Sequence, residues 1–306
     1  MYIFITNPNA RSGLGHKIWD DIETVLKKRG VTYQVYFTKY QQHATKIVRQ
    51  ITSDHERHNI IVLGGDGTVN EVINGIDCLA NVTLGYIPIG SSNDFARGLG
   101  LPADPLKALE NILAPVRHLA INIGVLEYGD KRRRFSVSTG LGFDAGVCHE
   151  VMVSRLKVFL NKIKLGKLSY AGVALHRMIS LDPKDMTVIM DGTRKLDFHK
   201  VYFATAMNLP MKAAALSSAP KQTARMIFWI SSSSQTCPRS RRLRFSPLRL
   251  RWHVFFRGIH IYTCKEIEII SEKALPVHAD GEPIFLQKRI KACLEPEKLR
   301  IIGAPE

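Results

Sequence analysis

Apolar runs alternate with amphipathic segments along the first part of the chain. Four runs rich in β-branched and aromatic residues predict strands: Tyr2–Thr6, Tyr33–Phe37, Asn59–Leu63 and Val82–Ile89. Between them, apolar residues at helical spacing predict one helix that ends just before Gly30 and a second helix over His43–Ile51. Strands that alternate with helices predict a mostly parallel, three-layer α/β domain.

Polar loops follow three of these strands, at the sheet edge where α/β domains bind ligands. They span residues 7–13, 64–68 and 90–97. The middle loop reads Gly64-Gly65-Asp66-Gly67-Thr68. Thr68 and Glu71 have the spacing of a capping box, which predicts that a helix starts there. Glycines let phosphate oxygens approach the free amides at the start of a helix, so the loop fits a phosphate-binding site. The alternative is a tight strand-to-helix turn, which also needs glycine. Asp66 would then hold Mg²⁺ or orient a hydroxyl, since a carboxylate repels phosphate.

The composition fits two domains, but the charge is concentrated in one stretch. The chain has 306 residues, 45% of them hydrophobic, and none of its apolar runs approaches the ~20 residues of a spanning helix. Its formal net charge is +16, and no acidic residue occurs for 68 positions between Asp197 and Glu266. Residues 211–252 hold nine of the basic residues, so the rest of the chain carries +7 and the total charge is a poor guide to partners. Five scattered cysteines without a CxxC pair predict a reducing cytoplasm and no zinc site.

Two basic segments each allow two interpretations. Lys131–Arg134 is predicted to be the exposed tip of a hairpin, where it could also touch anionic lipid. Val151–Lys167 is predicted to be a basic amphipathic helix, which lies either on a membrane or on the surface of an ordinary domain.

Five motifs together point to a known family. They are Asn7-Pro8 with Ser12-Gly13, Gly64-Gly65-Asp66-Gly67-Thr68-Val69-Asn70-Glu71-Val72, Pro88-Ile89-Gly90-Ser91-Ser92-Asn93-Asp94-Phe95-Ala96-Arg97, Thr139-Gly140-Leu141-Gly142-Phe143-Asp144-Ala145 and His278-Ala279-Asp280-Gly281-Glu282-Pro283. With them the chain resembles the diacylglycerol kinase catalytic-domain family of bacterial lipid kinases, which is related to sphingosine kinases and NAD kinases. The GGDGT motif alone is shared with NAD kinases, whereas its combination with GSSNDFAR and a late DGE is specific. The resemblance covers residues 1–210 and 253–306.

The resemblance implies an ATP- and Mg²⁺-dependent kinase that phosphorylates a lipid hydroxyl, with the conversion of diacylglycerol to phosphatidate as the first candidate. It implies an NAD kinase-like α/β nucleotide domain over residues 1–122 and an all-β, sandwich-like lipid-binding domain over residues 123–306. The implied ATP contacts are Asn7, Pro8, Asn9, Ser12, Gly13, Thr38, Gly64, Gly65, Asp66, Gly67, Thr68, Asn70, Glu71, Ser91, Asn93 and Asp94. Asp280 or Glu282 would be the general base, with Asp66 as the third catalytic residue. By itself, Asp280-Gly281 also fits a simple hairpin turn.

Residues 211–252 depart from the family pattern. Where the family has a glycine-rich turn, a proline, two adjacent aspartates and a strand, this chain has an alanine-rich segment, four serines and an arginine run. Codons can be chosen for residues 211–230 that read in another frame as a glycine-rich turn and an acidic loop. A frameshift is therefore our hypothesis, with a basic lineage-specific loop as the alternative. As written, the chain is expected to lack a second Mg²⁺ site of the family and to leave two strands of the sandwich unformed.

Other functions remain open. Transfer of phosphate to NAD would favour an NAD kinase-like soluble kinase, and ATP binding without turnover would favour a catalytically inactive nucleotide- or lipid-binding protein. A nucleic-acid-binding protein is disfavoured, because its basic patch would lie almost wholly in residues 211–252 and no RNA- or DNA-binding motif occurs. The expected setting is the cytoplasm, with transient contact to the inner face of the membrane, and a homodimer is left open.

Overall fold

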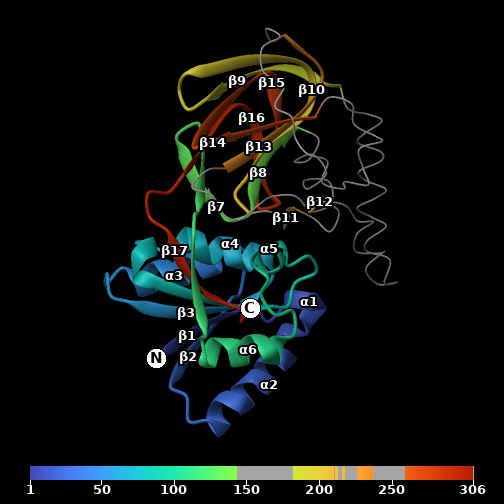
Figure 1. The fold of residues 1–306 in the computed structure, drawn as a ribbon. Coiled ribbons are helices and arrows are strands. Elements are labelled where there is room, and N and C mark those ends of the chain that lie inside the picture. The colour runs from blue at the N-terminus through green and yellow to red at the C-terminus, as the bar shows by residue number, and fades with distance from the viewer. Residues whose placement is uncertain (143–181, 210, 213–215, 218–225, 237–258, 306) are drawn as a thin grey trace.

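The computed structural model describes residues 1–142, 182–209, 211–212, 216–217, 226–236 and 259–305. These residues form an α/β domain and a β domain, which are drawn one above the other in Figure 1. The predicted helix over Val151–Lys167 lies outside the described residues.

A six-stranded sheet forms the middle layer of the α/β domain. Its strands are β1 (Tyr2–Thr6), β2 (Tyr33–Phe37), β3 (His58–Gly64), β4 (Val82–Pro88), β5 (Arg117–Ile121) and β17 (Leu299–Gly303). Their order is β2-β1-β3-β4-β17-β5, and every neighbouring pair is parallel except β17 with β5. The four runs predicted to be strands are all found here, so the predicted α/β class is confirmed.

Helices cover both faces of this sheet. On one face lie α2 (Gly15–Lys28) and α6 (Pro105–Leu113), and on the other lie α3 (His43–Thr52), α4 (Asp66–Gly75) and α5 (Asp94–Leu99). The alternation along β1 explains both layers, because successive side chains of a strand point to opposite faces. Phe4 packs with α2 and α6, whereas Ile3 and Ile5 pack with α3 and α4. The remaining helical turns are α1 (Ala10–Gly13) and η1 (Leu79–Asn81).

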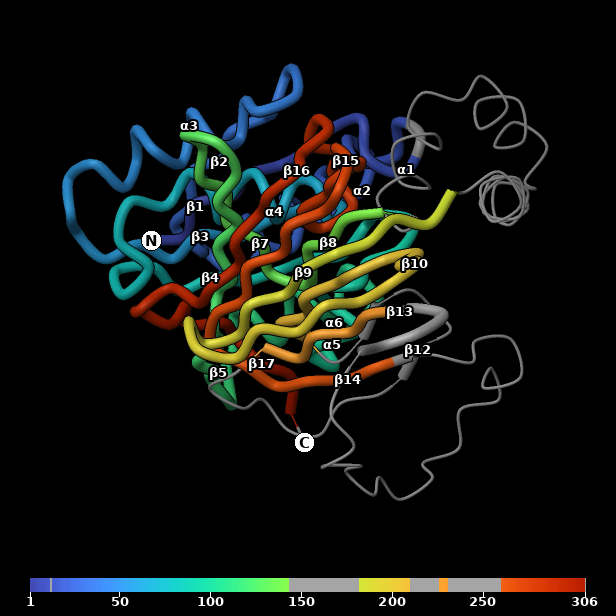
Figure 2. The backbone as a smooth tube through the Cα atoms, turned by 90° about the horizontal axis from the view of Figure 1, so that it is seen from above, coloured from blue at the N-terminus to red at the C-terminus, as the bar shows by residue number. Residues whose placement is uncertain are grey.

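The β domain is built on an antiparallel sheet of nine strands. They are β6 (Gly124–Tyr128), β7 (Lys131–Phe135), β8 (Ser138–Gly142), β9 (Lys184–Met190), β10 (Arg194–Met207), β13 (Met226–Thr236), β14 (Ile259–Cys264), β15 (Glu266–Ala279) and β16 (Glu282–Leu294). The order is β14-β13-β10-β8-β15-β16-β6-β7, and β9 pairs with both β10 and β15 (Figure 2). This double pairing folds the sheet over one apolar cluster, which gives the predicted sandwich-like domain. A separate short pair is formed by β11 (Met211–Lys212) and β12 (Leu216–Ser217).

The structure corrects two expectations about the second half of the chain. The predicted boundary 123–306 placed the end of the chain in the β domain. Strand β17 instead pairs with β4 and β5, so the end of the chain belongs to the α/β sheet. Within the anomalous stretch, β13 forms between β10 and β14, although strands there were expected to be missing. Every second residue at the start of β13 is buried in the core of the β domain: Met226, Phe228 and Ile230. This alternation is the sequence pattern of a strand, and the basic residues around it obscured it.

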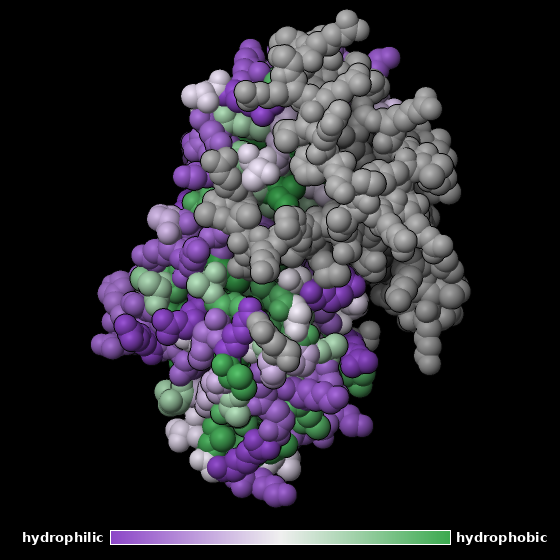
Figure 3. Space-filling view, in the orientation of Figure 1, coloured by the Kyte–Doolittle hydropathy of each residue, from purple (hydrophilic) through white to green (hydrophobic). Residues whose placement is uncertain are grey.

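The surface of the α/β domain is mainly polar on the face drawn in Figure 3, with apolar residues in small patches. Among the described residues, no helix combines the length and the apolar composition needed to cross a bilayer.

The two domains meet along α4, and the basic segment Lys131–Arg134 takes part in this contact. It was predicted to be an exposed hairpin tip. Instead, the guanidinium of Arg134 donates hydrogen bonds to the carbonyl oxygens of Ile73 (3.1 Å) and Ile76 at the end of α4. It also forms an ion pair of 2.5 Å with Glu295, and the two side chains are only 14% and 6% exposed. The prediction is therefore wrong for Arg134, because the last carbonyls of a helix need donors and attract a cation.

We expect Arg134→Met to lower the free energy of unfolding by about 3–5 kcal/mol, because it leaves buried acceptors and a buried carboxylate without this partner. Burial raises the pKa of Glu295, but hydrogen bonds from Arg134 and Arg132 outweigh this effect and hold the pKa below its ordinary value of 4.5. The stabilisation by the ion pair between Arg134 and Glu295 is therefore complete above pH 4.5, and it is lost as the pH falls through the folded-state pKa of Glu295.

Urea unfolding at neutral and acidic pH measures this effect. Arg132→Met is the matched control, because Arg132 bonds the same carboxylate at 2.6 Å but is 52% exposed. Its expected cost is about 0–1 kcal/mol. Equal costs for the two variants would contradict the role given to Arg134.

Candidate functional site

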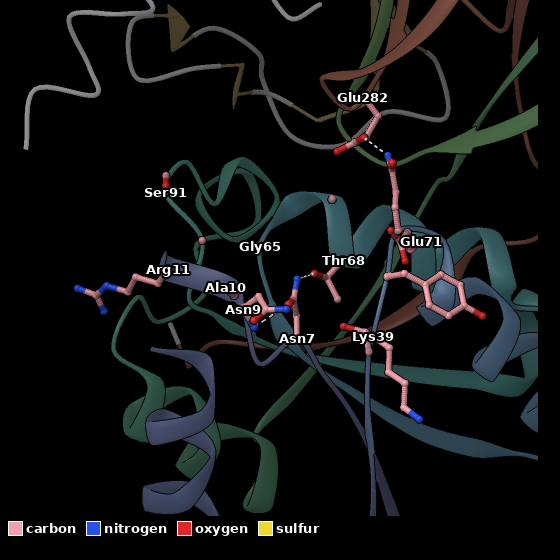
Figure 4. Close-up of a pocket in the computed structure, with 15 residues that line it drawn as sticks. Asn7, Asn9, Ala10, Arg11, Lys39, Gly65, Thr68, Glu71, Ser91 and Glu282 are labelled. Carbon is pink, nitrogen blue, oxygen red and sulfur yellow. Dashed lines mark hydrogen bonds between the residues drawn. The ribbon is translucent and has the colours of Figure 1, made fainter. Parts of the chain in front are cut away.

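A pocket of about 400 Å³ opens at the carboxyl ends of β1 to β4. It is lined by Asn7, Asn9, Ala10, Arg11, Thr38, Lys39, Tyr40, Gln41, Gly65, Gly67, Thr68, Glu71, Gly90, Ser91 and Glu282. The structure thus brings the three predicted loops together at one edge of the sheet (Figure 4). It adds a fourth loop, over residues 38–41, which the same argument would have found, since it follows the predicted strand Tyr33–Phe37.

Half of the predicted ATP contacts line this pocket. They are Asn7, Asn9, Thr38, Gly65, Gly67, Thr68, Glu71 and Ser91. Predicted contacts that lie beside the pocket without lining it are Pro8, Gly13, Gly64, Asp66, Asn70, Asn93 and Asp94. The side chain of Ser12 lies outside the described part of the structure. Of the two candidate bases, Glu282 lines the pocket and Asp280 does not.

The glycine loop leads into α4 one turn earlier than the capping box predicted. The helix begins at Asp66, with Gly65 as its N-cap residue, so Thr68 lies inside the first turn. The Thr68 hydroxyl accepts a hydrogen bond from Asn7 Nδ2 (3.3 Å). Glu71 does not close a box, because its carboxylate accepts the N–H of Ala44 (3.2 Å) in the first turn of α3. The capping-box prediction is therefore wrong, and both side chains instead tie α4 to neighbouring segments.

The loop needs its glycines for close approach of two backbones. None of Gly64, Gly65 and Gly67 has a positive φ, so a strained turn is not the reason for them. A Cβ on Gly90 would lie 2.7 Å from the Cα of Gly65, and a Cβ on Gly65 would lie 3.3 Å from the Cα of Gly90. The loops after β3 and β4 thus pack backbone against backbone beside the first amides of α4, which leaves those amides accessible to phosphate oxygens.

Asp66 faces α5 instead of the pocket. Its Oδ1 accepts the N–H of Phe95 (3.1 Å). Burial raises the pKa of Asp66 to about 6, although backbone hydrogen bonds from Phe95 and Asp94 act in the opposite direction. The structure therefore gives Asp66 a role in joining α4 to α5, and its predicted role with Mg²⁺ stays a prediction.

Asn93 and Asp94 shape the loop that follows β4. Asn93 adopts a left-handed conformation (φ 51°), and its Oδ1 accepts the N–H of Gly90 at 2.9 Å. Asp94 accepts the hydroxyl of Ser92 at 2.9 Å and pairs with Arg97. These contacts hold Gly90 and Ser91 at the wall of the pocket.

Asp280 is enclosed by hydrogen-bond donors. Its Oδ1 accepts the N–H groups of Val137 (2.7 Å) and Ser138 (3.0 Å). Its Oδ2 accepts the N–H (2.7 Å) and hydroxyl (3.0 Å) of Ser136 and the amide of Asn70 (2.9 Å). Two carboxylate oxygens offer about four lone-pair positions, so these five donors leave none for a substrate hydroxyl.

Asp280 also makes the turn that the sequence allowed. Asp280 and Gly281 have φ values of 51° and 80° and connect Ala279 to its partner Glu282, as in a tight two-residue hairpin. The hairpin interpretation of Asp280-Gly281 is therefore right, and the turn presents Glu282 to the pocket.

Glu282 has the properties that Asp280 lacks. It projects from the β domain toward the glycine loop, and a Cβ on Gly67 would lie 2.9 Å from its Oε1 (Figure 4). The hydrogen bond that Gln41 Nε2 donates to its Oε2 is long, at 3.4 Å. Burial raises the pKa of Glu282; Arg133 opposes this shift, whereas Glu71 and Asp280 add to it. A carboxylate with open lone pairs and a raised pKa is suited to accept a proton.

Sequence comparisons relate this chain to kinases. Residues 1–124 match the model of the diacylglycerol kinase catalytic domain. A Bacillus subtilis protein named "Putative lipid kinase YtlR" is 27% identical over 98% of this chain and 98% of its own length. The diacylglycerol kinase of Bacillus subtilis is 38% identical over 190 residues, which are 61% of this chain and 59% of that protein.

Solved structures share the fold over nearly the whole chain. A diacylglycerol kinase from Bacillus anthracis superposes with a TM-score of 0.66 at 19% identity, over 99% of this chain and 97% of that one. An NAD kinase from Archaeoglobus fulgidus in complex with ATP superposes with a TM-score of 0.52 at 12% identity, over 99% and 94% of the two chains. The predicted NAD kinase-like fold is confirmed. Residues 1–124 thus match a diacylglycerol kinase catalytic domain, the chain is similar over nearly its whole length to a putative lipid kinase, and it is a kinase phosphotransferase.

Proposed function

We propose that this kinase transfers the γ-phosphoryl group of ATP to the hydroxyl of a membrane lipid, with diacylglycerol as the first candidate. One observation carries the proposal: Glu282 of the β domain faces the glycine loop of the α/β domain across one pocket. Phosphoryl transfer to an alcohol needs a cradle for the phosphates and an acceptor for the hydroxyl proton. The α/β domain would supply the cradle with its glycine loop, and the β domain would supply the proton acceptor with Glu282.

The phosphates would lie at the first turn of α4, where Gly65 and Gly67 leave the backbone uncovered. Among the described residues, no cluster of three acidic, histidine or cysteine side chains could hold a metal by itself. Mg²⁺ would therefore take most of its ligands from phosphate oxygens and water, as this ion commonly does, with Glu71 as the additional carboxylate at the pocket wall. When bound, Mg²⁺ supplies positive charge that neutralises the transferring phosphoryl group.

Glu282 would take the proton of the lipid hydroxyl as the oxygen bonds to phosphorus. Its raised pKa makes the carboxylate a stronger base than an exposed glutamate. Asp280 would keep the turn in place and would not exchange protons with the substrate, because its oxygens are occupied.

The pH dependence of kcat/KM follows from the raised pKa. Because Glu282 must be ionised to accept a proton, we expect kcat/KM to rise with pH along an acid limb centred above 4.5, the ordinary value of glutamate. Asp66, with a pKa of about 6, titrates nearby. The acid limb should therefore persist in Asp66→Asn, measured as kcat/KM between pH 4.5 and 8.5. Its disappearance in that variant would assign the limb to Asp66.

Exposed apolar residues beside Glu282 support contact with a lipid surface. Phe285 and Leu286 are 86% and 61% exposed and follow Glu282 on β16, within about 13 Å along the strand. We expect Phe285→Ser combined with Leu286→Ser to lower turnover on lipid vesicles at least about 10-fold, since burying even one such side chain contributes about 1.5–3 kcal/mol. Turnover of a short-chain, water-dispersed substrate should not change.

The matched control for this pair is Val116→Ser. Val116 is 77% exposed in the α/β domain, just before β5. A loss of vesicle turnover in Val116→Ser as large as that in the double variant would contradict a membrane contact at β16.

The test of the function is transfer of labelled phosphate from ATP and Mg²⁺ to a panel of lipid alcohols in mixed micelles, with NAD as a separate acceptor. Transfer to diacylglycerol supports the proposal, and transfer to another lipid corrects its substrate. Transfer to NAD alone would favour the NAD kinase alternative, and ATP binding without any transfer would favour an inactive binding protein.

The same assay tests the frameshift hypothesis. It should include a chain in which residues 211–252 are read in the other frame. Activity only in that chain would support the frameshift, whereas activity in both would make residues 211–252 a tolerated variation.

A further inference from the structure

Asn70 joins the nucleotide-binding helix to the turn that carries the candidate base. The side chain is buried, with 1% of the residue exposed, and it does not line the pocket, although an ATP contact was predicted. Its Nδ2 donates hydrogen bonds to Asp280 Oδ2 (2.9 Å) and to the carbonyl oxygen of Arg134 (3.1 Å). Its Oδ1 accepts hydrogen bonds from Nη2 (2.7 Å) and Nε (3.3 Å) of Arg133. One amide therefore satisfies a carboxylate, a backbone carbonyl and a guanidinium.

The spacing on α4 places this amide directly behind the site. Gly67 and Asn70 are three residues apart, so they lie one above the other on the same face of the helix. Gly67 faces Glu282, and Asn70 bonds to Asp280, two residues earlier in the hairpin. Successive turns of the helix therefore contact both carboxylates of the hairpin.

We propose that Asn70 is a positioning residue for the general base: it fixes both the turn that carries Glu282 and the guanidinium of Arg133. The inference rests on the proposed function, because it assigns the role of base to Glu282. Asn70 itself touches neither the nucleotide pocket nor Glu282, so it acts through Asp280 and Arg133.

The charges around Glu282 make this role measurable. Arg133 on β7 lowers its pKa, whereas Glu71 on α4 and Asp280 in the hairpin raise it. Without Asn70, Arg133 loses the acceptor that orients its guanidinium. Its positive charge then offsets less of the increase that Glu71 and Asp280 cause in the pKa of Glu282. We therefore expect Asn70→Leu to move the acid limb of kcat/KM about 0.5–1 pH unit higher and to lower kcat at least about 10-fold. The KM for ATP should change less than about 3-fold, because Asn70 does not line the pocket.

Asn74 offers a matched control on the next turn of α4. Its Nδ2 donates to the carbonyl oxygens of Arg134 (3.0 Å) and Asn70 (2.8 Å) and, at a longer 3.3 Å, to Asn70 Oδ1, and its Oδ1 accepts the Arg134 N–H (2.8 Å). The bonds of Asn70 to Asp280 and Arg133 do not pass through Asn74. It thus contacts the same strand as Asn70, but no hydrogen bond to Asp280 is found for it. Asn74→Leu should lower the unfolding temperature and leave the acid limb in place.

The experiment compares the full-length chain with Asn70→Leu, Asn74→Leu and Arg133→Gln. It measures kcat, the KM for ATP and the acid limb on the lipid that the wild type phosphorylates, together with amide hydrogen exchange at residues 136–138. The amides of these residues donate to Asp280, so Asn70→Leu should speed their exchange more than Asn74→Leu. Equal acid limbs and equal exchange in the two variants would overturn the inference and leave Asn70 with a purely structural role.

Two further outcomes keep this inference separate from the proposed function. If Asn70→Leu does not fold, Arg133→Gln must by itself raise the acid limb, and an unchanged limb would overturn the inference. If the wild type phosphorylates no lipid, the proposed function fails. Amide exchange then still decides whether Asn70 holds the turn, because faster exchange in Asn70→Leu alone supports it and unchanged exchange excludes it.

Discussion

Glu282→Gln is expected to lower kcat for phosphate transfer by about 10²–10⁴-fold, the contribution typical of a general base. The amide keeps the size of the side chain but cannot accept the hydroxyl proton at neutral pH. The affinity for ATP should stay close to that of the wild type, because the glycine loop and the residues after β1 are unchanged. Initial rates on lipid micelles, with nucleotide binding measured separately, check both parts.

The stability of Glu282→Gln has a predicted sign. A carboxylate whose pKa is raised by burial destabilises the folded state increasingly as the pH rises above the unfolded-state value. The glutamine variant should therefore unfold at the same temperature as the wild type, or a higher one, at pH 7–8. A variant that keeps more than about a tenth of wild-type kcat would exclude Glu282 as the base.

Asp280→Asn is expected to cost about 3–5 kcal/mol of the free energy of unfolding, since it disrupts a half-buried carboxylate that accepts five hydrogen bonds. The amide nitrogen of asparagine would face groups that are themselves donors, among them the N–H groups of residues 136–138. Activity should fall as well, because the turn that holds Glu282 loses its anchor. Urea unfolding followed by circular dichroism measures the loss of stability.

Asp191→Asn is the matched control for Asp280→Asn. Asp191 and Gly192 form a similar turn, with φ values of 48° and 67°, and Asp191 Oδ1 accepts the N–H groups of Lys265 and Glu266. Asp191 is exposed, and its turn connects β9 to β10. Its expected cost is about 0.5–1.5 kcal/mol. Full stability of Asp280→Asn together with a large loss of kcat would contradict the anchoring role and make Asp280 the base.

The comparison of these two carboxylates shows a limit of sequence reasoning. Asp280 and Glu282 are two residues apart, and both residue types can act as bases. The difference between them comes from their partners: Ser136, Val137, Ser138 and Asn70 surround Asp280, whereas Glu282 meets Gln41 and the glycine loop. These partners are more than 140 residues away along the chain, and local spacing carries no record of them.

The charged segment Lys131–Arg134 shows the same limit. A run of four basic residues just after Gly129 is typical of an exposed hairpin tip. The first two, Lys131 and Arg132, are indeed exposed. Arg134 is not, because the carbonyls at the end of α4 and the carboxylate of Glu295 come together at its position. Only the packing of the β domain on α4 creates that environment.

The sequence alone determined the features that depend on local chemistry. Apolar runs between polar loops predicted the strands β1, β3 and β4, because burial on both faces requires continuous apolar residues. The glycine loop and the polar segments after the strands predicted a phosphate-binding edge, because the carboxyl ends of parallel strands always meet there. The motifs were sufficient to predict the kinase family.

The tertiary structure decided everything that depends on which segments meet. It returned β17 to the α/β sheet, set Thr68 and Glu71 against Asn7 and α3, and turned Asp66 toward α5. It also placed Asn70 behind the candidate base instead of in the pocket. The physical reason is the same in each case: hydrophobic periodicity specifies which face of an element is buried, but a hydrogen bond needs a particular partner at a particular distance, and that partner is supplied by a distant part of the chain.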